Sequence, residues 1–534
     1  MKRFFNAIFV LLFLFPVVQN DICRISAQAQ SNTIKGVVYH DRNYNGKLDS
    51  RDKPLKGVAL SNGRDVVVTN RRGEYELPVR DNAAIFVIKP RNWMVAVDDN
   101  QVPRYYVMHS REGLSGDRYG GLPASGELPG SLNFPLYPSK EPKKIKGLIF
   151  GDTQPRNLQE IYYASKAILP ELIGTDANFG VTLGDIVFND LSLFNDVAGS
   201  LSVVGVPMWY VPGNHDVDFT ARDRVAGRGA WFNTFGPNYY SFTYGPAHFV
   251  VLDNIYWTGE EDNPYSNYTT GLGEDQMQFL ENEINRIDKK QWLVILAHIP
   301  SEASTKWINQ EEKERFYSLL SRHEKTISLA AHTHRHFHHF VGKEQNYPGE
   351  GPLHMVSVGT VCGAWWTGAP DIYGVPHAMM RDGTPNGYAF LHIDEKDWSL
   401  EWKVARKPED FQMHISIPDV ITIDDSGDKV KVLANIFNAM PDAEVKMRVG
   451  EEGEWVDMEC KSQKDPYRVA EMEREEKMEN LSWRKMTGVV ASRHIWEAEF
   501  RPEFDNPGFY SIYVKAKDRW HQFEGRQIIH VVLP

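Results

Sequence analysis

Cysteine is scarce in this sequence, with only Cys23, Cys362 and Cys460 among 534 residues. So few cysteines exclude a disulfide-rich scaffold, although an exported protein could bridge Cys362 and Cys460. Basic residues are also in deficit, because 59 lysines and arginines face 71 aspartates and glutamates and leave a formal net charge of -12. This balance argues against nucleic acid as a partner. After the N-terminal region, no apolar run reaches the length of a transmembrane helix.

The N-terminal region has the order of a secretory signal peptide. Lys2 and Arg3 precede a short apolar run, and small residues follow up to Ala29. Cys23 has no small-residue box of a lipoprotein before it, so we assign it to the discarded segment. We therefore expect residues 1–29 to be removed and the mature protein to be soluble, in a periplasm or outside the cell.

The length predicts two to four domains, and 42% hydrophobic with 24% charged residues is typical of folded proteins. Short alternating runs separated by turn residues predict a β-sandwich over residues 31–142. Residues 143–406 alternate apolar β-like runs, among them 145–150 and 292–297, with helical runs at roughly 158–173, 274–287 and 310–323, which predicts an α/β domain. The β pattern returns over residues 407–534 and predicts a second β-sandwich, interrupted by the charge-alternating stretch 470–481, which we expect to be an exposed helix.

A loop near the start of the mature chain has the oxygen spacing of a calcium site. Its oxygen-bearing positions 1, 3, 5, 7, 9 and 12 are Asp41, Asn43, Asn45, Lys47 through its carbonyl, Asp49 and Asp52. Gly46 at position 6 permits the sharp turn. Two interpretations stay open, a structural calcium ion and a metal-free turn held by Asn and Asp side chains.

Five apolar strands predicted within 143–406 end in metal-binding side-chain types. Their ends read FGDTQ, TLGDIVFND, VPGNHD, ILAHIP and SLAAHTHRH. Open α/β sheets place ligands at the carboxyl ends of their strands. A pair of divalent ions needs oxygen and imidazole donors from several directions, with one anionic oxygen shared between the ions. The strand ends supply such a set: Asp152 and His334 for one ion, Asn214, His298 and His332 for the other, and Asp185 as the bridge.

The ordered series resembles the calcineurin-like metallophosphoesterase superfamily. It consists of Asp152-x-Gln154, Gly184-Asp185, Gly213-Asn214-His215-Asp216, His298 and His332-x-His334. The later stretch VCGAWWTG…DIYGVPHAMMRDGTPNGY is similar to an exported bacterial subfamily with an all-β domain on each side of the enzyme. The resemblance implies a central four-layer α/β/β/α sandwich, two β-sheets face to face with helices outside, and a dinuclear site at one edge.

The resemblance also implies chemical roles. His215 would protonate or hydrogen-bond the leaving-group oxygen, and Asp216 would fix its orientation and tautomer. Two divalent ions, Mn, Fe, Zn or Mg, would provide a metal-bound hydroxide that attacks a phosphate monoester or diester. We expect a small phosphorylated substrate, such as a metabolite, a sugar or a lipid head group.

Two positions depart from the commoner family pattern. Gln154 stands where His is usual, and its amide oxygen is a weaker donor toward transition metals. Ala331 replaces the usual Gly before His332, where a methyl group could restrict the loop. The alternative function is therefore a surface or glycan-binding protein with a degraded site on the same fold.

Three further side chains are candidates for substrate contact. His338 shares a strand face with His334, and Trp365 and Trp366 follow a strand in a Gly-rich stretch where they could stack on a sugar or lipid group. The other interpretation is that they are packed residues that anchor a loop.

Overall fold

The central part of the chain contains two β-sheets. The computed structural model describes residues 33–116, 118–257, 268–303, 305–422 and 428–533, so the predicted signal peptide 1–29 lies outside the described residues. The first sheet has the order β14 (Met208–Tyr210), β13 (Phe179–Thr182), β12 (Ile145–Phe150), β23 (Gly387–Ile393) and β24 (Trp398–Val404). The second has the order β15 (Tyr240–Tyr244), β16 (Ala247–Leu252), β19 (Trp292–Ala297), β20 (Thr326–Ala330), β22 (Leu353–Ser357) and β21 (Phe337–Val341).

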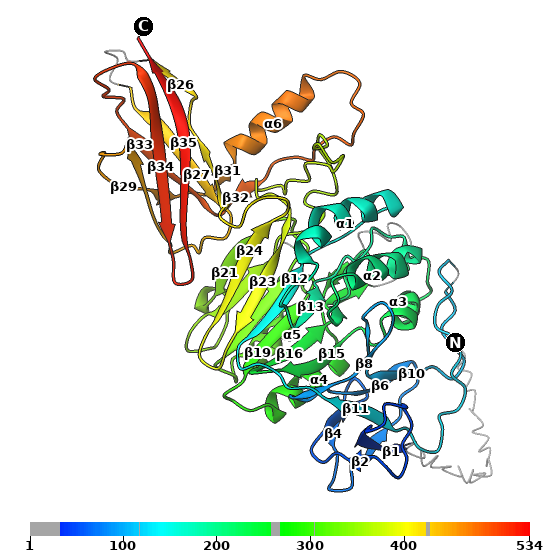
Figure 1. Ribbon diagram of the computed structural model, residues 1–534. Coiled ribbons are helices and arrows are strands. Elements are labelled where there is room, and N and C mark those ends of the chain that lie inside the picture. The colour runs from blue at the N-terminus through cyan, green and yellow to red at the C-terminus, as the bar shows by residue number, and fades with distance from the viewer. Residues whose placement is uncertain (1–32, 117, 258–267, 304, 423–427, 534) are drawn as a thin grey trace, which may run out of the picture. The chain divides into compact units, whose positions relative to one another are not determined.

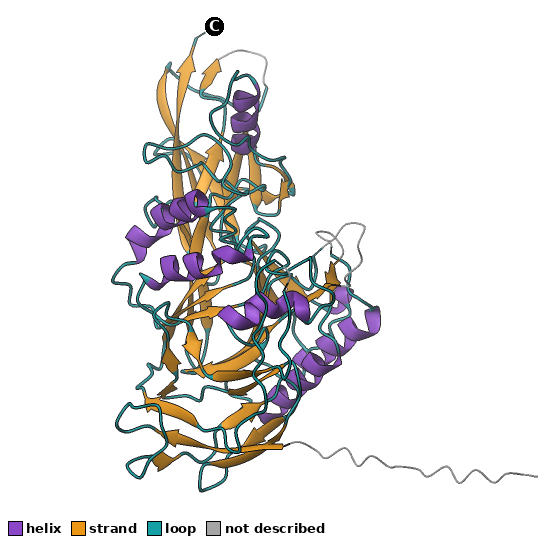
Figure 2. Ribbon diagram, turned by 90° about the vertical axis from the view of Figure 1, so that its right-hand side faces the viewer, coloured by secondary structure: helices purple, strands orange, loops and turns teal. Residues whose placement is uncertain are grey.

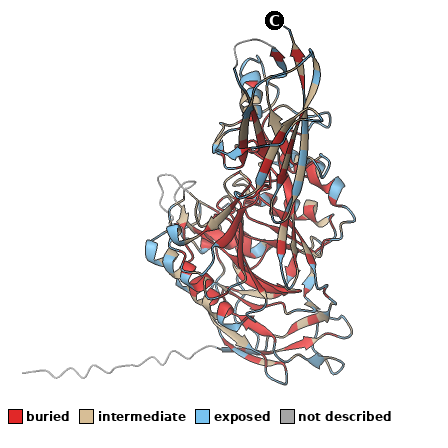
Figure 3. Cartoon of the chain, turned by 90° about the vertical axis from the view of Figure 1, so that its left-hand side faces the viewer, coloured by how far each residue is buried: buried red, intermediate tan, exposed pale blue. Residues whose placement is uncertain are grey.

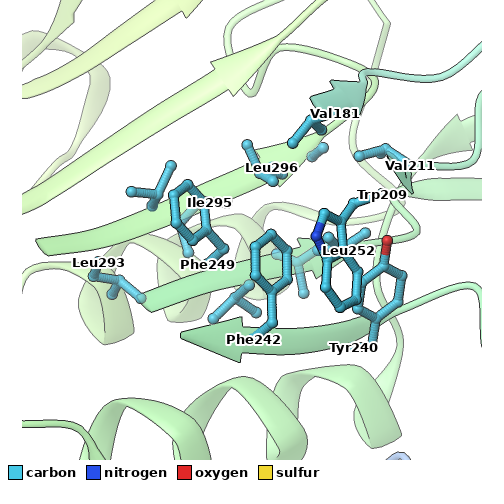
Figure 4. Packing of buried hydrophobic residues seen from close by; sticks show 14 of the residues in the cluster. Val181, Trp209, Val211, Tyr240, Phe242, Phe249, Leu252, Leu293, Ile295 and Leu296 are labelled. Atoms are coloured by element: carbon cyan, nitrogen blue, oxygen red, sulfur yellow. The ribbon is translucent and has the colours of Figure 1, made fainter. Parts of the chain in front are cut away.

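The two sheets pack face to face through large apolar side chains (Figure 4). Trp209 of the first sheet stacks on Phe242 of the second, with ring centroids 4.1 Å apart. Phe179 meets the edge of Phe249 at 5.2 Å. Side chains on these strands alternate between the two faces of a sheet, but both faces are covered, so the sequence shows continuous apolar runs rather than alternation. Figure 3 shows the resulting concentration of buried residues in the central strands.

Helices cover the outer faces of both central sheets (Figures 1 and 2). Leu148 and Phe150 of the first sheet share a buried cluster with apolar residues of α1 and α2. The second sheet shares its cluster with α4 and α5. The helices are α1 (Leu158–Leu172), α2 (Phe194–Ser202), α3 (Gly229–Thr234), α4 (Glu274–Arg286), α5 (Gln310–Leu320) and α6 (Pro466–Glu476), with short 3₁₀ turns η1 (Leu191–Leu193), η2 (Ala226–Arg228) and η3 (Lys343–Gln345). This arrangement is the four-layer sandwich that was predicted.

Strand-rich segments flank the central sheets. The N-terminal strands are β1 (Thr33–His40), β2 (Lys53–Pro54), β3 (Ala59–Ser61), β4 (Val66–Val68), β5 (Glu74–Pro78), β6 (Ala83–Val87), β7 (Trp93–Met94), β8 (Ala96–Val97), β9 (Pro103–Arg104), β10 (Tyr106–His109) and β11 (Phe134–Pro138). The C-terminal strands are β25 (Met413–Ser416), β26 (Val420–Thr422), β27 (Val430–Ile436), β28 (Glu444–Val449), β29 (Val456–Asp457), β30 (Glu459–Cys460), β31 (Gln463–Lys464), β32 (Ala491–Ser492), β33 (Ile495–Phe500), β34 (Gly508–Lys517) and β35 (Gln522–Val532). A small hairpin, β17 (Ile255–Trp257) with β18 (Tyr268–Thr270), extends from the central part. The predicted domain boundaries at residues 142 and 406 stay predictions.

The predicted charge-alternating helix begins earlier than expected and is not wholly exposed. Helix α6 spans Pro466–Glu476, with the Asp465 side chain capping its N-terminus. Arg468 and Glu475 are both buried. Glu475 accepts hydrogen bonds from Trp483 Nε1 and from the Met486 backbone N–H, both at 2.7 Å. The helix therefore anchors the segment that follows it, which the charge pattern alone did not indicate.

Candidate metal centre

The seven predicted ligands meet at the carboxyl ends of the central strands. Strands β12 and β13 are parallel neighbours in one sheet, and β19 and β20 are parallel neighbours in the other. The loops that follow these four strands all contribute ligands to the cluster. Direct contacts link Asp152, Gln154, Asp185, Asn214, His298, His332 and His334 into one cluster. All of them except His332 are buried.

Three donor atoms crowd together on one side of this cluster. Asn214 Oδ1 lies 3.0 Å from both His298 Nε2 and His332 Nδ1. The two ring nitrogens are themselves 3.2 Å apart. His298 Nδ1 lies 2.8 Å from the Leu183 carbonyl, to which it donates a hydrogen bond when Nε2 carries a lone pair. Donors about 3 Å apart suit a single cation whose ligands lie about 2 Å away.

Asp185 lies between the two predicted metal positions. Its Oδ2 is 3.3 Å from His298 Nε2 and accepts a 3.0 Å hydrogen bond from Gln154 Nε2. Its Oδ1 accepts a 2.8 Å bond from the backbone N–H of His215. Ligand atoms of Asp185, His298 and His332 lie within 4.8 Å of one another, which marks them as a candidate metal site.

The remaining predicted ligands, Asp152 and His334, form the other side. Asp152 Oδ2 is fully buried and lies 3.1 Å from His334 Nε2, yet it receives no hydrogen bond among the described residues. His334 Nδ1 is 2.5 Å from the Gly363 carbonyl, so its Nε2 is the atom that faces Asp152. Cys362 lies behind this pair, with its Sγ 3.8 Å from both His334 Nδ1 and Gln154 Oε1. A buried carboxylate oxygen 3.1 Å from an imidazole nitrogen suits a cation held by both.

The backbone at the cluster is strained. Gln154, Asp185, His332 and His334 have φ values of 40°, 49°, 65° and 50°, in the left-handed region that side chains other than Gly rarely adopt. Each such residue costs on the order of 1–3 kcal/mol, and such strain concentrates at functional sites. Ala331 is not among the residues with positive φ, so its methyl group does not distort the loop; the left-handed residue is the next one, His332.

Two motif glycines allow the loops to approach closely. A Cβ on Gly213 would lie 2.1 Å from the Asp185 backbone nitrogen, and one on Gly184 would lie 2.5 Å from His298 Nδ1. Gly184 also has a φ of 96°. The glycines before Asp185 and Asn214 are therefore required by packing at the cluster itself.

The electrostatics of the cluster favour a cation. Burial lowers the pKa of His298, but the Asp185 carboxylate outweighs this effect and raises the pKa to about 9. Burial, and then the charge of His298, lowers the pKa of His332 to about 3. Burial would raise the pKa of Asp185, yet the neighbouring His298 and His215 hold it below its usual range. The carboxylate thus keeps its negative charge, and a divalent ion would take the place of the His298 proton.

His215 is oriented by Asn189, and the prediction that Asp216 orients it is wrong. His215 Nδ1 lies 2.7 Å from Asn189 Oδ1, which leaves Nε2 facing the cluster, 4.0 Å from Asp185 Oδ2. The Asp216 carboxylate instead accepts backbone N–H bonds from Ile186, Val187 and Gly213 at 3.1, 3.2 and 2.8 Å. Asp216 therefore joins the loop that carries Asp185 to the loop that carries Asn214.

Asp216 is held in an unusual environment. Burial, and then the charge of Asp185, raises its pKa to about 7. Asn189, which holds His215, is not among the site residues predicted from the sequence. Its only sequence signal is its position four residues after Asp185, which does not show where its side chain points.

Of the three candidates for substrate contact, only Trp365 lies at the surface of the cluster. Its ring centroid is 4.2 Å from that of His334, and it is half-buried. Trp366 is buried and donates from Nε1 to the Thr153 carbonyl at 3.1 Å. His338 is buried between His354 and Asn438, each 3.0 Å from one ring nitrogen. Trp366 and His338 are thus packed residues, the second of the two interpretations, and substrate contact stays a prediction.

The loop proposed for calcium is closed by its own hydrogen bonds. Asp41 is buried, and its carboxylate accepts from Gly46 N at 2.7 Å and from the Tyr137 hydroxyl at 3.1 Å. Asp49 accepts from Asn43 Nδ2 at 2.9 Å. The remaining positions are held by bonds made by Asn45, Lys47 and Asp52. These contacts describe a turn held by Asn and Asp side chains, and a calcium ion in it stays a prediction.

Three family models match the chain in order. They are the N terminal of calcineurin-like phosphoesterase at residues 42–117, calcineurin-like phosphoesterase at 145–336, and the C terminal of calcineurin-like phosphoesterase at 356–523. The middle match contains all of the candidate ligands.

Comparison with solved structures gives a more distant similarity. A purple acid phosphatase isolated from yellow lupin (Lupinus luteus) seeds is 16% identical, with a TM-score of 0.36, over 65% of this chain and 66% of that chain. The chain thus spans slightly less than two thirds of the length of that phosphatase. A comparison with curated proteins finds no match. No helix among the described residues is long and apolar enough to cross a membrane.

Proposed function

We propose that this chain, which belongs to the calcineurin-like phosphoesterases, is an exported enzyme that cleaves a small phosphate monoester or diester at a dinuclear site. Members of this family hydrolyse phosphoric ester bonds with divalent metal ions. The observation that carries this proposal is the approach of Asn214, His298 and His332 to within about 3.2 Å of one another beside Asp185. Export rests on the N-terminal sequence pattern alone.

The ligands divide between two ions. Asn214, His298 and His332 would hold one ion, Asp152 and His334 the other, and Asp185 would contact both. Bound divalent ions supply Lewis acidity and lower the pKa of a coordinated water. Manganese, iron, zinc and magnesium all accept oxygen ligands, and the three imidazoles favour the transition metals among them.

The protein's own residues orient the substrate and handle the proton. His215 Nε2 faces the cluster while Asn189 holds Nδ1, so a proton on Nε2 is available to the departing oxygen. Buried neighbours restrict water around the ligands, which strengthens their charge interactions. The Cys362 thiol lies behind His334, with its Sγ 3.8 Å from His334 Nδ1, and burial raises its pKa, which makes it a poor nucleophile.

The alternative of a binding protein with a degraded site has less support. Ala331 leaves the loop undistorted, and Gln154 reaches Asp185. The Gln154 nitrogen now donates to Asp185. If the amide turns by about 180° in the proposed holoenzyme, its oxygen takes the place of the nitrogen and can bind the ion. We therefore propose that Gln154 is a weak ligand of the first ion.

Substitution of Gln154 tests this assignment. We expect Gln154→His to tighten manganese or zinc binding at the first site, because imidazole is the stronger donor, and Gln154→Leu to weaken it by roughly ten- to hundredfold. Calorimetric titration of metal-stripped protein measures both. Equal affinities in the unsubstituted protein and both variants would contradict a role for Gln154 in metal binding.

The proposed activity is tested by metal analysis followed by hydrolysis assays. Purified protein is assayed with para-nitrophenyl phosphate and with its bis ester in the presence of added manganese. Two bound ions with turnover of either ester are the expected result, and the ratio of the two rates separates monoesterase from diesterase. A protein with neither metal nor turnover would be the binding protein instead.

A further inference from the structure

Two hydrogen-bond donors without partners lie beside the metal cluster. Arg156 follows Gln154 by two residues, and its Nη2 is buried and forms no hydrogen bond with a described residue. Trp365, which packs on His334, has an unpartnered buried Nε1 as well. Arg156 Nη1 donates to the Trp365 carbonyl at 3.3 Å, so the two side chains belong to one surface. Unpartnered buried N–H groups are costly and suit an acceptor from a ligand.

Arg156 is also connected to the proposed proton donor. Its guanidinium carbon lies 4.0 Å from the ring centroid of Phe188. The Phe188 ring stacks on His215, with centroids 4.5 Å apart and planes 25° from parallel. Since His215 would face the oxygen of the leaving group, Arg156 lies on the leaving-group side of the cluster, separated from the His215 ring by the ring of Phe188.

A second arginine from the distant C-terminal segment comes to the same surface. Arg484 lies in the segment anchored by Glu475, and its carbonyl accepts a 2.8 Å hydrogen bond from the backbone of Gly368, close to Trp365. The Arg484 side chain is exposed, and partial desolvation, followed by the positive charge of Arg156, lowers its pKa. Arg484 forms no ion pair with a described carboxylate, whereas Arg156 pairs with Glu160 at 3.2 Å. Two guanidinium groups with one carboxylate leave an excess positive charge.

We propose that Arg156, Arg484 and Trp365 form a subsite that binds a second anionic group and a flat ring on the leaving group of the substrate. The guanidinium groups and unpartnered donors suit a phosphate, and the Trp365 ring suits stacking on an aromatic group. This subsite rests on the proposed function and extends its substrates from esters to phosphoanhydrides whose leaving group is itself anionic, such as a nucleoside diphosphate. In that case water adds to the terminal phosphorus, the bond to the bridging oxygen breaks, and the products are inorganic phosphate and a nucleoside monophosphate that takes up the proton.

Adenosine diphosphate and adenosine monophosphate form a matched pair of probes. Both contain the adenine ring. The group that leaves is adenosine monophosphate in one case and adenosine in the other, so only the first carries a phosphate. The diphosphate has the better leaving group, so kcat/KM for phosphate release at equal free manganese favours it even without the subsite. The test is the change in this ratio: we expect Arg484→Gln to reduce it by about tenfold, as for loss of one charge-assisted hydrogen bond. Arg474→Gln is the control, because Arg474 is an exposed arginine of helix α6 that pairs with Glu471.

A binding measurement separates failure of the subsite from failure of the proposed hydrolysis. Calorimetry with the manganese-loaded His215→Ala variant compares the affinities of the two nucleotides with and without Arg484→Gln. If the protein hydrolyses neither the nucleotides nor the para-nitrophenyl esters but still binds the diphosphate more tightly through Arg484, the subsite stands and the hydrolase proposal does not. If Arg484→Gln leaves the ratio between the two nucleotides unchanged in both kinetics and binding, the subsite is overturned.

Discussion

Replacing Asp185 with alanine is expected to remove both metal ions and to reduce hydrolysis to the background rate. The Asp185 carboxylate contacts His298 on one side of the cluster and Gln154 on the other, so it lies where a ligand shared by the two proposed ions would be. Its loss would leave the ions to repel one another without a shared anion. Metal content by plasma emission spectrometry and turnover of para-nitrophenyl phosphate measure the two effects.

A matched aspartate provides the control for this variant. Asp176 has an 80% exposed side chain that pairs with Lys146, and Asp176→Ala should retain metal and activity. Thermal unfolding of both variants shows whether they fold. A folded Asp185→Ala protein that retains two ions and its turnover would contradict the bridging role.

Replacing His215 with alanine should have a different signature, with metal retained and turnover lost. The ring is held by Asn189 and does not contact the ligand atoms of Asn214, His298 or His332. We therefore expect unchanged metal content and a rate that is lower by roughly two to four powers of ten, the usual contribution of a positioned general acid. The loss should be largest for esters with poor leaving groups, because these need the proton most.

The comparison between two esters makes this second test specific. An alkyl phosphate, with a poor leaving group, should lose more activity than para-nitrophenyl phosphate. His530→Ala is the control, since His530 stacks on Phe509 in a C-terminal strand and has no part in the cluster. Equal losses for both esters would assign His215 to substrate binding, and no loss for either would remove it from the reaction.

The sequence predicted the central fold because its helices and strands follow simple rules. Helix α1 was expected at 158–173 and occupies Leu158–Leu172, and strands β12 and β19 have the expected bounds. The ligand positions followed from the rule that strand ends meet at one sheet edge. Helices α2 and α3 were not predicted, since they are short and helix α3 has only six residues.

The errors arose where a contact joins distant parts of the chain. Alternation along a strand predicted that His338 shares a face with His334, but it could not show that Asn438, a hundred residues later, contacts the His338 ring. Burial then lowers the pKa of His338 to about 4, which is typical of a neutral packed imidazole. Asn189 was missed as the partner of His215 for a similar reason, because a loop's side-chain direction depends on its tertiary surroundings.

The proposed function requires that these strand-end residues hold two cations. Anomalous diffraction from manganese-soaked crystals tests it most directly. We predict two peaks about 3.5–4 Å apart, with Asp185 between them, one beside His298 and His332 and the other beside Asp152 and His334. A single peak away from Asp185, or no peak among these residues, would contradict the dinuclear site and the hydrolysis proposed to depend on it.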